Sequence, residues 1–406
     1  MRCPWLLPLT LLVGLLLGPA GACDDRLWYL DPANGSDAND CHTPQTACQS
    51  AGRLQEILAQ ARPGEVIRLK RGTTLTPTQR LDLQTDGTAA QPILLEAYGE
   101  GALPILDGSQ IPSGNMILQC QRRAWYVIRD LQFQYGKGAL MFLGCTDILI
   151  ERIAIVHQCL QECLHMKYDG PDATSQRITW QHSVMDVPDR AEGVYIGTDP
   201  EQDGGQPDLT SHITIANNVI ANGRQGECIE MKDGTSHVTI VGNQFANNVV
   251  PVNACIFSAK ARLSTPPGQH RIEGNTLYNT SGDNGYAIKI RNSATVRGNV
   301  VHTTTRDGIL LDQPSGHEDH ERVAEHNTVL YAAGAGITVS GGKTTARNNI
   351  VWQSGGGNDA VDPQFVNPAR ADFRRRPGSP AVGRGAFPTP APTPDGAPGR
   401  AGEARR

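Results

Sequence analysis

The feature that most constrains the fold of this chain is a loose repeat of short segments rich in β-branched residues. The repeat begins near residue 124 and includes the segments "RITWQHSVM", "HITIANNVI" and "HVTIVGNQF". A second series of short apolar segments, among them "EGVYIG", "ECIEMK" and "YAIKIR", alternates with the first. Such short segments, separated by turns rich in glycine, asparagine and aspartate, predict strands rather than helices. Because one unit cannot bury its own apolar face, the pattern predicts an all-β solenoid, a parallel β-helix of about eight or nine coils.

An asparagine recurs at a similar place in six consecutive repeats. The spacing ranges from 22 to 32 residues, and the positions are Asn218, Asn243, Asn275, Asn299, Asn327 and Asn349. Stacked coils would bring these residues into one column, where each side-chain amide can bond the amide of the next coil. We therefore expect an asparagine ladder along one turn of the solenoid.

The ends of the chain differ from the repeat. Residues 1–22 contain Arg2, an apolar run and a small-residue cleavage site, which is typical of a secretory signal peptide. Residues 23–110 are expected to form an N-terminal cap with the first strands, residues 111–354 the β-helix, and residues 355–385 an irregular C-terminal cap. The amphipathic pattern from Ser50 to Ala61 predicts a helix that covers the open end of the stack. Residues 386–406 are rich in proline, alanine and glycine and are expected to be disordered.

Charge and cysteine content limit the partners and the compartment. The formal net charge of −5 argues against nucleic acid as a partner. Beyond the signal peptide no apolar run is long enough to predict a transmembrane segment. The chain has ten cysteines, which are expected to form disulfides in an oxidising compartment; Cys41 and Cys48 bracket a short loop and could bridge. We expect a secreted or periplasmic protein in which Cys23, the first mature residue, is a candidate for a lipid anchor.

Alternation along the strands predicts which side chains leave the core. In "ECIEMK", Ile229 and Met231 are expected to point inward, and Cys228, Glu230 and Lys232 outward. Aligning the coils on their inward pairs gives two outward columns. The first column is His165, Tyr195, Glu230, Phe257, Lys289, Leu310 and Thr338, and the second is Lys167, Gly197, Lys232, Ala259, Arg291, Asp312 and Ser340. Because adjacent coils lie about 4.8 Å apart, the charged and aromatic members should form one patch suited to an extended sugar polymer.

A third column, just before the strands, is acidic in three consecutive coils and consists of Glu162, Glu192 and Glu227. Like charges stacked this closely are costly unless a cation or a base lies between them. Glu227 has inward parity on its strand, so it can reach solvent only from the corner where the strand begins. This column therefore predicts a site where a cation or a base lies between the glutamates.

Several segments resemble the secreted bacterial right-handed parallel β-helix proteins of the pectate-lyase-like superfamily. They are "YLDPANGSDANDC", "PGEVIRLKRGTT", "PILLEAYGEG" and "DPQFVNPARADFRRRPGSPA". Within that superfamily, the spacing from Glu227 to Lys232 is similar to the E-x-x-x-x-K strand of the alginate lyase and chondroitinase B family. In that family the glutamate binds calcium and the lysine is the catalytic base, so the resemblance implies these roles for Glu227 and Lys232. The match is partial, because Ala259 stands where the family has an arginine, with Lys260 beside it, and Gln225 replaces a second acidic ligand.

The predicted function is that of a polysaccharide lyase, which cleaves a uronic-acid-containing polymer by β-elimination. In this hypothesis Lys232 is the base, Tyr195 or His165 the proton donor, and Glu227 with Glu192 or Glu230 holds Ca²⁺. The residues expected to bind the polymer are Lys167, Glu230, Lys289, Arg291 and Lys260. Three alternatives remain on the same fold: a non-catalytic glycan-binding or structural protein, a glycoside hydrolase that pairs Glu192 or Glu230 with Asp312, and a uronate epimerase.

Overall fold

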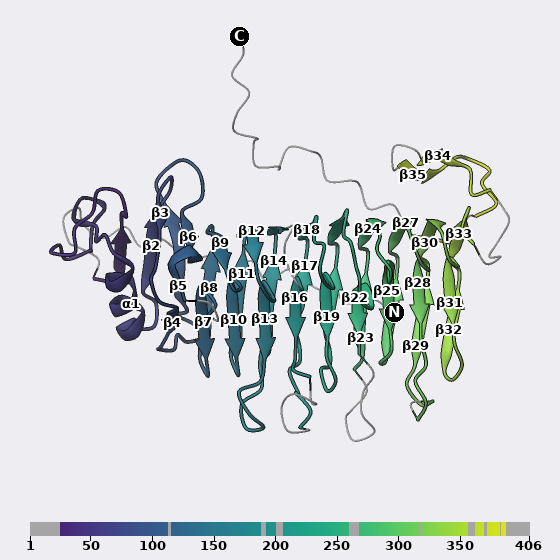
Figure 1. Ribbon diagram of the computed structural model, residues 1–406, viewed down its shortest axis with the longest axis horizontal. Coiled ribbons are helices and arrows are strands. Elements are labelled where there is room, and N and C mark those ends of the chain that lie inside the picture. Colours follow the sequence, from purple (N-terminus) through teal and green to yellow (C-terminus); the bar gives the residue numbers. More distant parts are fainter. Residues whose placement is uncertain are drawn as a thin grey trace, which may run out of the picture.

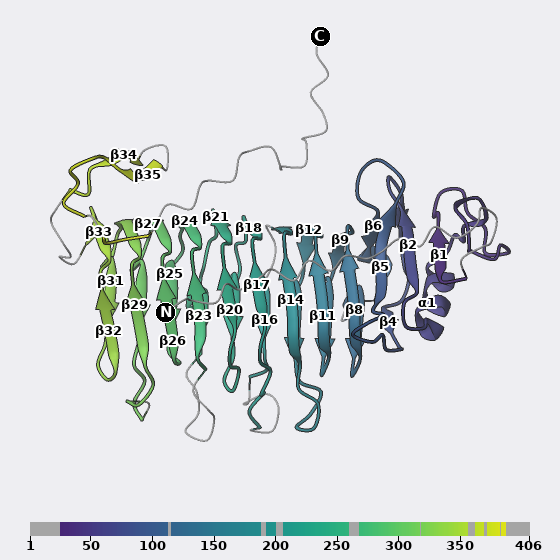
Figure 2. The same ribbon diagram turned by 180° about the vertical axis from the view of Figure 1, so that it is seen from behind.

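The computed structural model describes residues 25–112, 115–187, 192–199, 206–259, 268–316, 318–355, 362–368, 372–381 and 383–386. The predicted signal peptide, Cys23, Lys260 and residues 387–406 of the predicted tail lie outside these ranges. Successive coils stack along one long axis, from the N-terminal to the C-terminal end of the chain (Figures 1 and 2).

Nearly every strand in the described part of the chain belongs to one of three long parallel sheets. The 12-stranded sheet consists of β1 (Leu27–Leu30), β2 (Val66–Lys70), β5 (Ile93–Tyr98), β8 (Ala124–Arg129), β11 (Thr146–Glu151), β14 (Gln176–Gln181), β17 (Thr214–Ala216), β20 (Thr239–Val241), β23 (His270–Glu273), β26 (Ala294–Arg297), β29 (Arg322–Glu325) and β32 (Thr344–Arg347). The 11-stranded sheet consists of β3 (Thr74–Leu75), β6 (Ile105–Asp107), β9 (Gln132–Gly136), β12 (Ala154–Cys159), β15 (Val184–Asp186), β18 (Val219–Ala221), β21 (Gln244–Ala246), β24 (Thr276–Thr280), β27 (Val300–Thr304), β30 (Thr328–Ala332) and β33 (Ile350–Trp352). The 10-stranded sheet consists of β4 (Leu81–Leu83), β7 (Leu118–Gln121), β10 (Leu140–Leu143), β13 (Leu164–Lys167), β16 (Val194–Ile196), β19 (Ile229–Met231), β22 (Ala254–Ser258), β25 (Tyr286–Ile290), β28 (Ile309–Leu311) and β31 (Ile337–Val339).

This arrangement confirms the prediction of a right-handed parallel β-helix. The stack is longer than the eight or nine coils expected, because strands before residue 111 join the same three sheets. The irregular spacing of those first coils hides them from a search for a repeat. Inward side chains form one continuous apolar core that runs from Leu30 to Val351.

A helix lies at the N-terminal end of the stack (Figure 1). α1 (Ala51–Gln60) begins after Ser50, whose side chain accepts a hydrogen bond from the backbone of Arg53. The predicted helix is therefore confirmed to within one residue at each end. Its apolar residues Leu54, Ile57 and Leu58 are fully buried in the core, which explains why a helix of only ten residues is stable here.

The same helix satisfies the backbone of an edge strand. β4 lies at the end of the 10-stranded sheet, so one side of it has no neighbouring strand. The Gln55 side chain donates a hydrogen bond to the Asp82 carbonyl at 3.1 Å and accepts one from the Asp82 N–H at 2.7 Å. A single amide side chain thus replaces part of the missing strand, which protects the edge from pairing with another chain.

The predicted asparagine ladder is present at the turn between the 12-stranded and 11-stranded sheets. Each Nδ2 donates to the Oδ1 of the asparagine on the next coil, at 2.9 to 3.1 Å, from Asn218 through to Asn349. The same Oδ1 atoms accept the backbone N–H of the preceding asparagine. Every buried polar group of the column is therefore paired along the axis of the stack.

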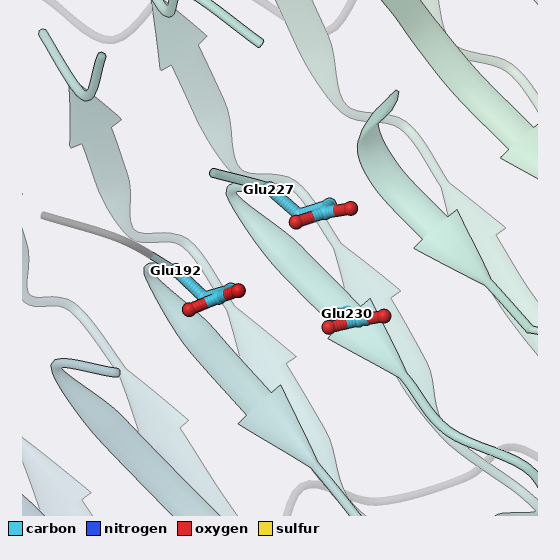
Figure 3. A group of neighbouring side chains, drawn as sticks. All are labelled: Glu192, Glu227 and Glu230. Carbon is cyan, nitrogen blue, oxygen red and sulfur yellow. The ribbon is translucent and has the colours of Figure 1, made fainter. Parts of the chain in front are cut away.

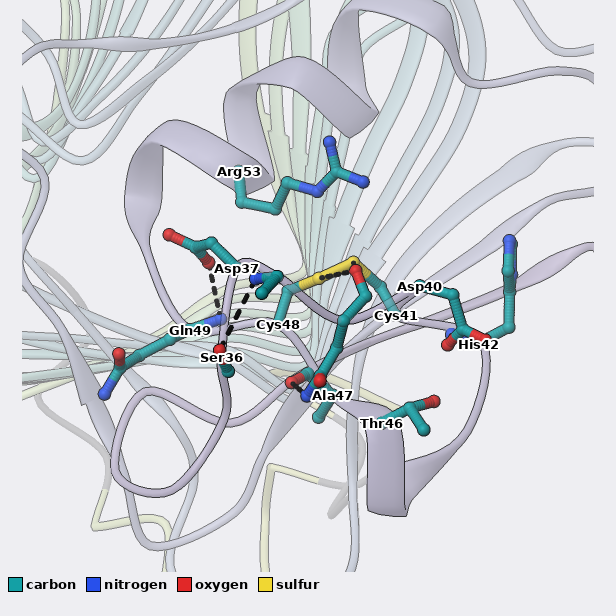
Figure 4. Close-up of a disulfide and its surroundings, with 12 residues drawn as sticks. Ser36, Asp37, Asp40, Cys41, His42, Thr46, Ala47, Cys48, Gln49 and Arg53 are labelled. Atoms are coloured by element: carbon teal, nitrogen blue, oxygen red, sulfur yellow. Dashed lines mark hydrogen bonds between the residues drawn. A yellow bond between two sulfur atoms is a disulfide. The ribbon is translucent and has the colours of Figure 1, made fainter.

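Three disulfides occur among the described residues, which fits a chain that folds in an oxidising compartment. The predicted Cys41–Cys48 bridge is confirmed and closes the loop before α1 (Figure 4). Asp37, which precedes this loop, accepts hydrogen bonds from the backbone of Gln49 and Ser50, at 2.8 and 2.9 Å. The other two bridges, Cys120–Cys145 and Cys228–Cys255, each link neighbouring coils.

The described part of the C-terminal segment contains an antiparallel hairpin, β34 (Phe365–Asn367) and β35 (Asp372–Arg375). Phe365 packs against Leu330 and Ile350, which point outward from the last strands of the 11-stranded sheet. Short 3-10 helices occur at Pro44–Thr46 and Gly108–Gln110. None of the described helices is both long and apolar enough to cross a membrane.

Candidate active site

The candidate site lies on the outer face of the 10-stranded sheet, around β13, β16 and β19. The strand register places Tyr195 beside His165 on one side and beside Glu230 on the other. The next partners along the row are Phe257 and Lys289. This order is the one expected for the first outward column, because inward apolar pairs fix the register wherever one face of a strand is buried.

The second outward column is also in register. The backbone N–H of Lys232 donates a hydrogen bond to the Ile196 carbonyl at 2.8 Å, and that of Arg291 donates one to the Ser258 carbonyl at 3.1 Å. Gly197 lies directly beside Lys232 with φ +88°, a conformation that favours glycine. A Cβ at Gly197 would approach the Lys232 Cβ to 3.1 Å and the Thr235 Cγ2 to 2.6 Å, so a larger residue would crowd the lysine.

Three glutamates converge near the starts of β16 and β19 (Figure 3). One carboxylate oxygen from each of Glu192, Glu227 and Glu230 lies within 4.8 Å of the others. Glu192 and Glu227 stand at the starts of adjacent strands, and Glu230 lies on β19. Glu162, which belongs to the same acidic column, is not a member of this group of three.

Two of these three carboxylates are buried, which is rare for charged side chains. Glu227 and Glu230 are each only 3% exposed. Burial raises the pKa of Glu227, although its Oε1 accepts a hydrogen bond from the Asn253 side chain at 2.7 Å. Burial and then the charge of Glu227 raise the pKa of Glu230 to about 7. The sequence indicated an outward column but not its burial, which arises because side chains on consecutive coils cover one another.

Lys232 is held by its neighbours. Its Nζ forms an ion pair with Glu230 at 2.6 Å and lies 4.8 Å from the centre of the Tyr195 ring. Burial by itself lowers the pKa of Lys232, but the attraction of Glu230 and Tyr195 outweighs it, and the pKa lies above its ordinary value. A lysine that acts as a general base needs a lowered pKa. The pairing with Glu230 instead favours the ammonium form of Lys232.

Tyr195 and His165 form the other half of the site. Their rings meet edge to face, with centroids 4.8 Å apart. Burial raises the pKa of Tyr195, so the phenol stays protonated over the physiological range. Burial lowers the pKa of His165 to about 3, and its Nε2 lies 3.3 Å from the Gly197 carbonyl. At neutral pH Tyr195 therefore carries a proton to donate, whereas His165 is a neutral ring that packs against it.

Three of the other residues predicted to bind a polymer lie at β13 and β25 of the same sheet. Lys167 is half-buried on β13, next to His165. Lys289 Nζ lies over the rings of Phe257 and Tyr286, at 5.8 and 5.6 Å from their centres. Arg291 forms an ion pair with Asp312 at 2.9 Å.

The register also bears on the hydrolase alternative that uses Asp312. This residue follows β28, three strands away from β19, which corresponds to about 14 Å. Paired carboxylates of inverting glycosidases are only about 6.5 to 9.5 Å apart. Asp312 therefore cannot pair with Glu230 across one scissile bond.

Two features of the site were missed or misread from the sequence. Cys228 was expected to point outward, but it is fully buried and bonded to Cys255 on the next coil. The strand begins only at Ile229, so alternation does not extend back to Cys228. The sequence did contain a signal for this disulfide, because Cys228 and Cys255 each directly precede an inward isoleucine of the aligned coils. The second feature is Asn253, which orients Glu227 from the loop before β22 and carries no recognisable pattern.

Comparisons with known proteins agree with the fold. No protein-family model matches the chain. A segment of 137 residues is 38% identical to pectate lyase PEL9 of Emericella nidulans; it covers 31% of this chain and only 32% of that protein. An alginate lyase from Paenibacillus sp. FPU-7 superposes with a TM-score of 0.56 at 19% identity, over 76% of this chain and 98% of that one. A lacto-N-biosidase from Eubacterium ramulus gives the same TM-score at 16% identity, over 81% of this chain and 65% of that one. These likenesses show the parallel β-helix fold.

Proposed function

We propose that this protein is a secreted or periplasmic polysaccharide lyase that cleaves a uronic-acid-containing polymer by β-elimination. The observation that carries the proposal is the meeting of Lys232, Tyr195 and three glutamates on one face of the 10-stranded sheet. The segment that is 38% identical to a pectate lyase supports the same reaction class. The three disulfides support an oxidising compartment outside the cytosol.

Elimination from a uronic acid has three requirements. Positive charge or a hydrogen-bond donor must neutralise the sugar carboxylate, because the neighbouring C5 proton is otherwise barely acidic. A base must remove that proton, and an acid must protonate the leaving oxygen. All three kinds of group are within reach of one sugar unit on this face.

The glutamate cluster fits a calcium ion. Calcium takes six to eight oxygen ligands and binds carboxylates readily. Glu192, Glu227 and Glu230 offer only oxygen, and burial makes their mutual repulsion costly without a cation. A calcium ion held by these three residues would supply the charge that neutralises the sugar carboxylate and offsets the negative field around Lys232.

Lys232 is the residue we assign as the base. Its pKa is raised chiefly by Glu230, in opposition to burial. Once the charge of that glutamate is balanced, burial is left as the main influence, and burial favours the neutral amine. Gly197 lets the backbone pack close to Lys232, where any side chain would meet Thr235 Cγ2 and the Lys232 Cβ.

Tyr195 is the residue we assign as the proton donor. Its phenol is protonated, lies beside Lys232 and is held edge-on by His165. His165 is then a positioning residue and not the donor, since burial keeps its ring neutral. Lys167 on one side and Lys289 on the other lie along the direction in which a polymer would cross the strands, where they would bind its carboxylates.

The test is a lyase screen on alginate, pectate, glucuronan and glycosaminoglycans, with and without EDTA. Unsaturated ends, detected by their ultraviolet absorbance, are expected from at least one polymer, and EDTA is expected to abolish them. Lys232→Ala should remove the activity entirely. Lys343→Ala is the matched control, because Lys343 is exposed and paired only with the exposed Asp319. Undiminished cleavage by Lys232→Ala would exclude Lys232 as the base.

A second candidate function is glycoside hydrolysis, and Glu230 is the observation that favours it. A carboxyl with a pKa of about 7 can hold a proton at neutral pH and act as a general acid. Carboxylates of Glu192 and Glu227 lie within 4.8 Å and could assist it. Products separate the two candidates: new reducing ends without ultraviolet absorbance indicate a hydrolase, and retained polymer without cleavage indicates a binding protein.

A further inference from the structure

In the two outward columns of the 10-stranded sheet, charge occurs on every second strand from β13 to β25. In the second column, Lys167 ends β13, Lys232 follows β19 and Arg291 follows β25. The strands between them, β16 and β22, contain no charged residue, and they are followed in this column by Gly197 and Ala259. Two strand spacings, about 10 Å, therefore separate successive cations.

The 12-stranded sheet balances its charges in a different way. On four of its neighbouring strands, cations and anions alternate and each pairs with the next: Arg68, Glu96, Arg129 and Glu151. Opposite charges on adjacent strands stabilise a sheet, whereas like charges directly opposite destabilise it. Stability favours such an alternation of sign, and the uncharged strands β16 and β22 do not follow it.

Two lysines of the 10-stranded sheet form no ion pair with any carboxylate in the described part of the chain, and they flank the candidate site evenly. Lys167 lies on β13, two strands before β19, and Lys289 on β25, two strands after it. Lys289 is half-buried over the rings of Phe257 and Tyr286, and burial followed by the charge of Arg291 lowers its pKa. A half-buried ammonium group without a counter-charge is costly, so each lysine offers a place to a carboxylate of a ligand.

The spacing of these two lysines matches one arrangement of carboxylates in a polymer. One pyranose unit of an extended polymer has about the length of one strand spacing, so a polymer that crosses the strands places every second unit opposite β13, β19 and β25. Its carboxylates meet all three strands only if they face the sheet on every second unit. A chain in which a uronic acid alternates with an uncharged sugar meets this condition. A β-1,4-linked uronan meets it too, because each unit is turned by half a rotation from the one before.

We propose that the substrate is a polymer that presents a carboxylate to this face at every second sugar unit, and that Lys167 and Lys289 bind the carboxylates two units to either side of the unit at β19. The inference rests on the proposed lyase function and adds to it the repeat of the substrate. The unit at β19 is then the one beside Lys232. Pectate does not meet the condition, because the three-fold twist of its α-1,4-linked chain brings a carboxylate to the same side only at every third unit.

The first experiment measures kcat/KM of the intact protein for three kinds of polymer. Glucuronan and mannuronate-rich alginate are β-1,4-linked uronans, chondroitin and hyaluronan are alternating chains, and pectate is the comparison. The best value among the first two kinds should exceed that of pectate by about ten-fold or more, the effect of at least one charge-assisted hydrogen bond. Cleavage of one kind alone identifies which chain supplies the spacing, and cleavage of both fits the spacing they share. A value for pectate closer to the best than this would overturn the inference and leave the lyase function intact.

Variants test the two lysines on the polymer that is cleaved best. Lys167→Gln and Lys289→Gln should each lower kcat/KM by about ten-fold or more, since each removes a charge-assisted hydrogen bond to the substrate. Lys343→Gln is the matched control and should behave as the wild type, because Lys343 is exposed and paired with the exposed Asp319. If either Lys167→Gln or Lys289→Gln keeps the wild-type value, the spacing on both sides of β19 is wrong.

A displaced charge separates the spacing from simple electrostatic attraction. Lys289→Gln/Ala259→Lys moves a positive charge from β25 to the position after β22, one strand spacing nearer to β19. The net charge of the face is unchanged, so non-specific attraction would restore the wild-type kcat/KM. The proposed spacing predicts that the loss remains, and restoration would overturn it. If no uronic acid polymer is cleaved at all, the proposed function is wrong and this inference is rejected with it.

Discussion

Glu227→Gln should make the cation-free protein more stable at pH 8 while weakening its response to calcium. Burial and then Glu227 raise the pKa of Glu230 from 4.5 to about 7. A difference of 2.5 units corresponds to about 3.4 kcal/mol. Between these pH values the folded protein holds a proton that the unfolded chain has lost, so stability falls as the pH rises from 4.5 through 7.

The part of the Glu230 pKa shift that Glu227 causes determines how much Glu227→Gln changes the stability. Burial is the larger cause, so we assign less than half of the shift to Glu227, about 1 kcal/mol. The substitution removes this repulsion and preserves the Glu230–Lys232 ion pair. The new amide oxygen can still accept the hydrogen bond from Asn253. We therefore expect a gain in Tm of about 2 °C at pH 8 in EDTA, and a much smaller gain at pH 4.5.

The assay is thermal unfolding at one scan rate, in EDTA and in calcium, for the wild type, Glu227→Gln and Glu56→Gln. Glu56 on α1 is exposed and paired with Arg53, so its substitution should change stability by less than about 0.5 kcal/mol. Calcium at about 100 times its Kd should stabilise the wild type by about 2.7 kcal/mol, and Glu227→Gln by less. A Glu227→Gln protein that is less stable than the wild type at pH 8 in EDTA would refute the reasoning. An equal gain at both pH values would refute it as well.

Two further predictions concern the proton donor and the ladder. Tyr195→Phe should lower kcat by about 10² to 10⁴ with little change in KM, because it removes only the phenolic proton; an unchanged kcat in steady-state assays would exclude Tyr195 as the donor. Asn275→Ala removes four buried hydrogen bonds, three to the preceding coil and one to the next, and should destabilise the protein by about 2 to 5 kcal/mol in urea unfolding. Asn349→Ala, at the more exposed end of the ladder, loses three and should cost clearly less; equal losses would contradict a role for burial.

Much of the architecture could be predicted from local patterns. The inward pairs of isoleucine, leucine, valine and methionine identify each strand of the 10-stranded sheet, and they fixed the rows that contain Tyr195 and Lys232 correctly. The amphipathic pattern from Ser50 to Ala61 marked α1. The strands before residue 111 were expected only as part of an N-terminal cap and not as full coils, because they follow no regular spacing, although they bury the same kinds of side chain.

The chemical state of the site could not be predicted in this way. Parity gives the side of a strand on which a residue lies but not how deeply its neighbours cover it. Glu230 and His165 are outward by parity and yet almost fully buried. The role of base requires a lowered pKa of Lys232, and that pKa is raised because the lysine side chain folds toward Glu230.

The sequence by itself determined the solenoid, the register of its coils and the rows in which the candidate residues stand, since these depend on which side chains must leave water. Only the tertiary structure decided that the carboxylates of Glu192, Glu227 and Glu230 converge within 4.8 Å, and that Asp169 from the loop after β13 pairs with Arg122. Such distances depend on side-chain rotamers and on the corners between strands. Several coils fix these jointly, and no single segment of the sequence encodes them.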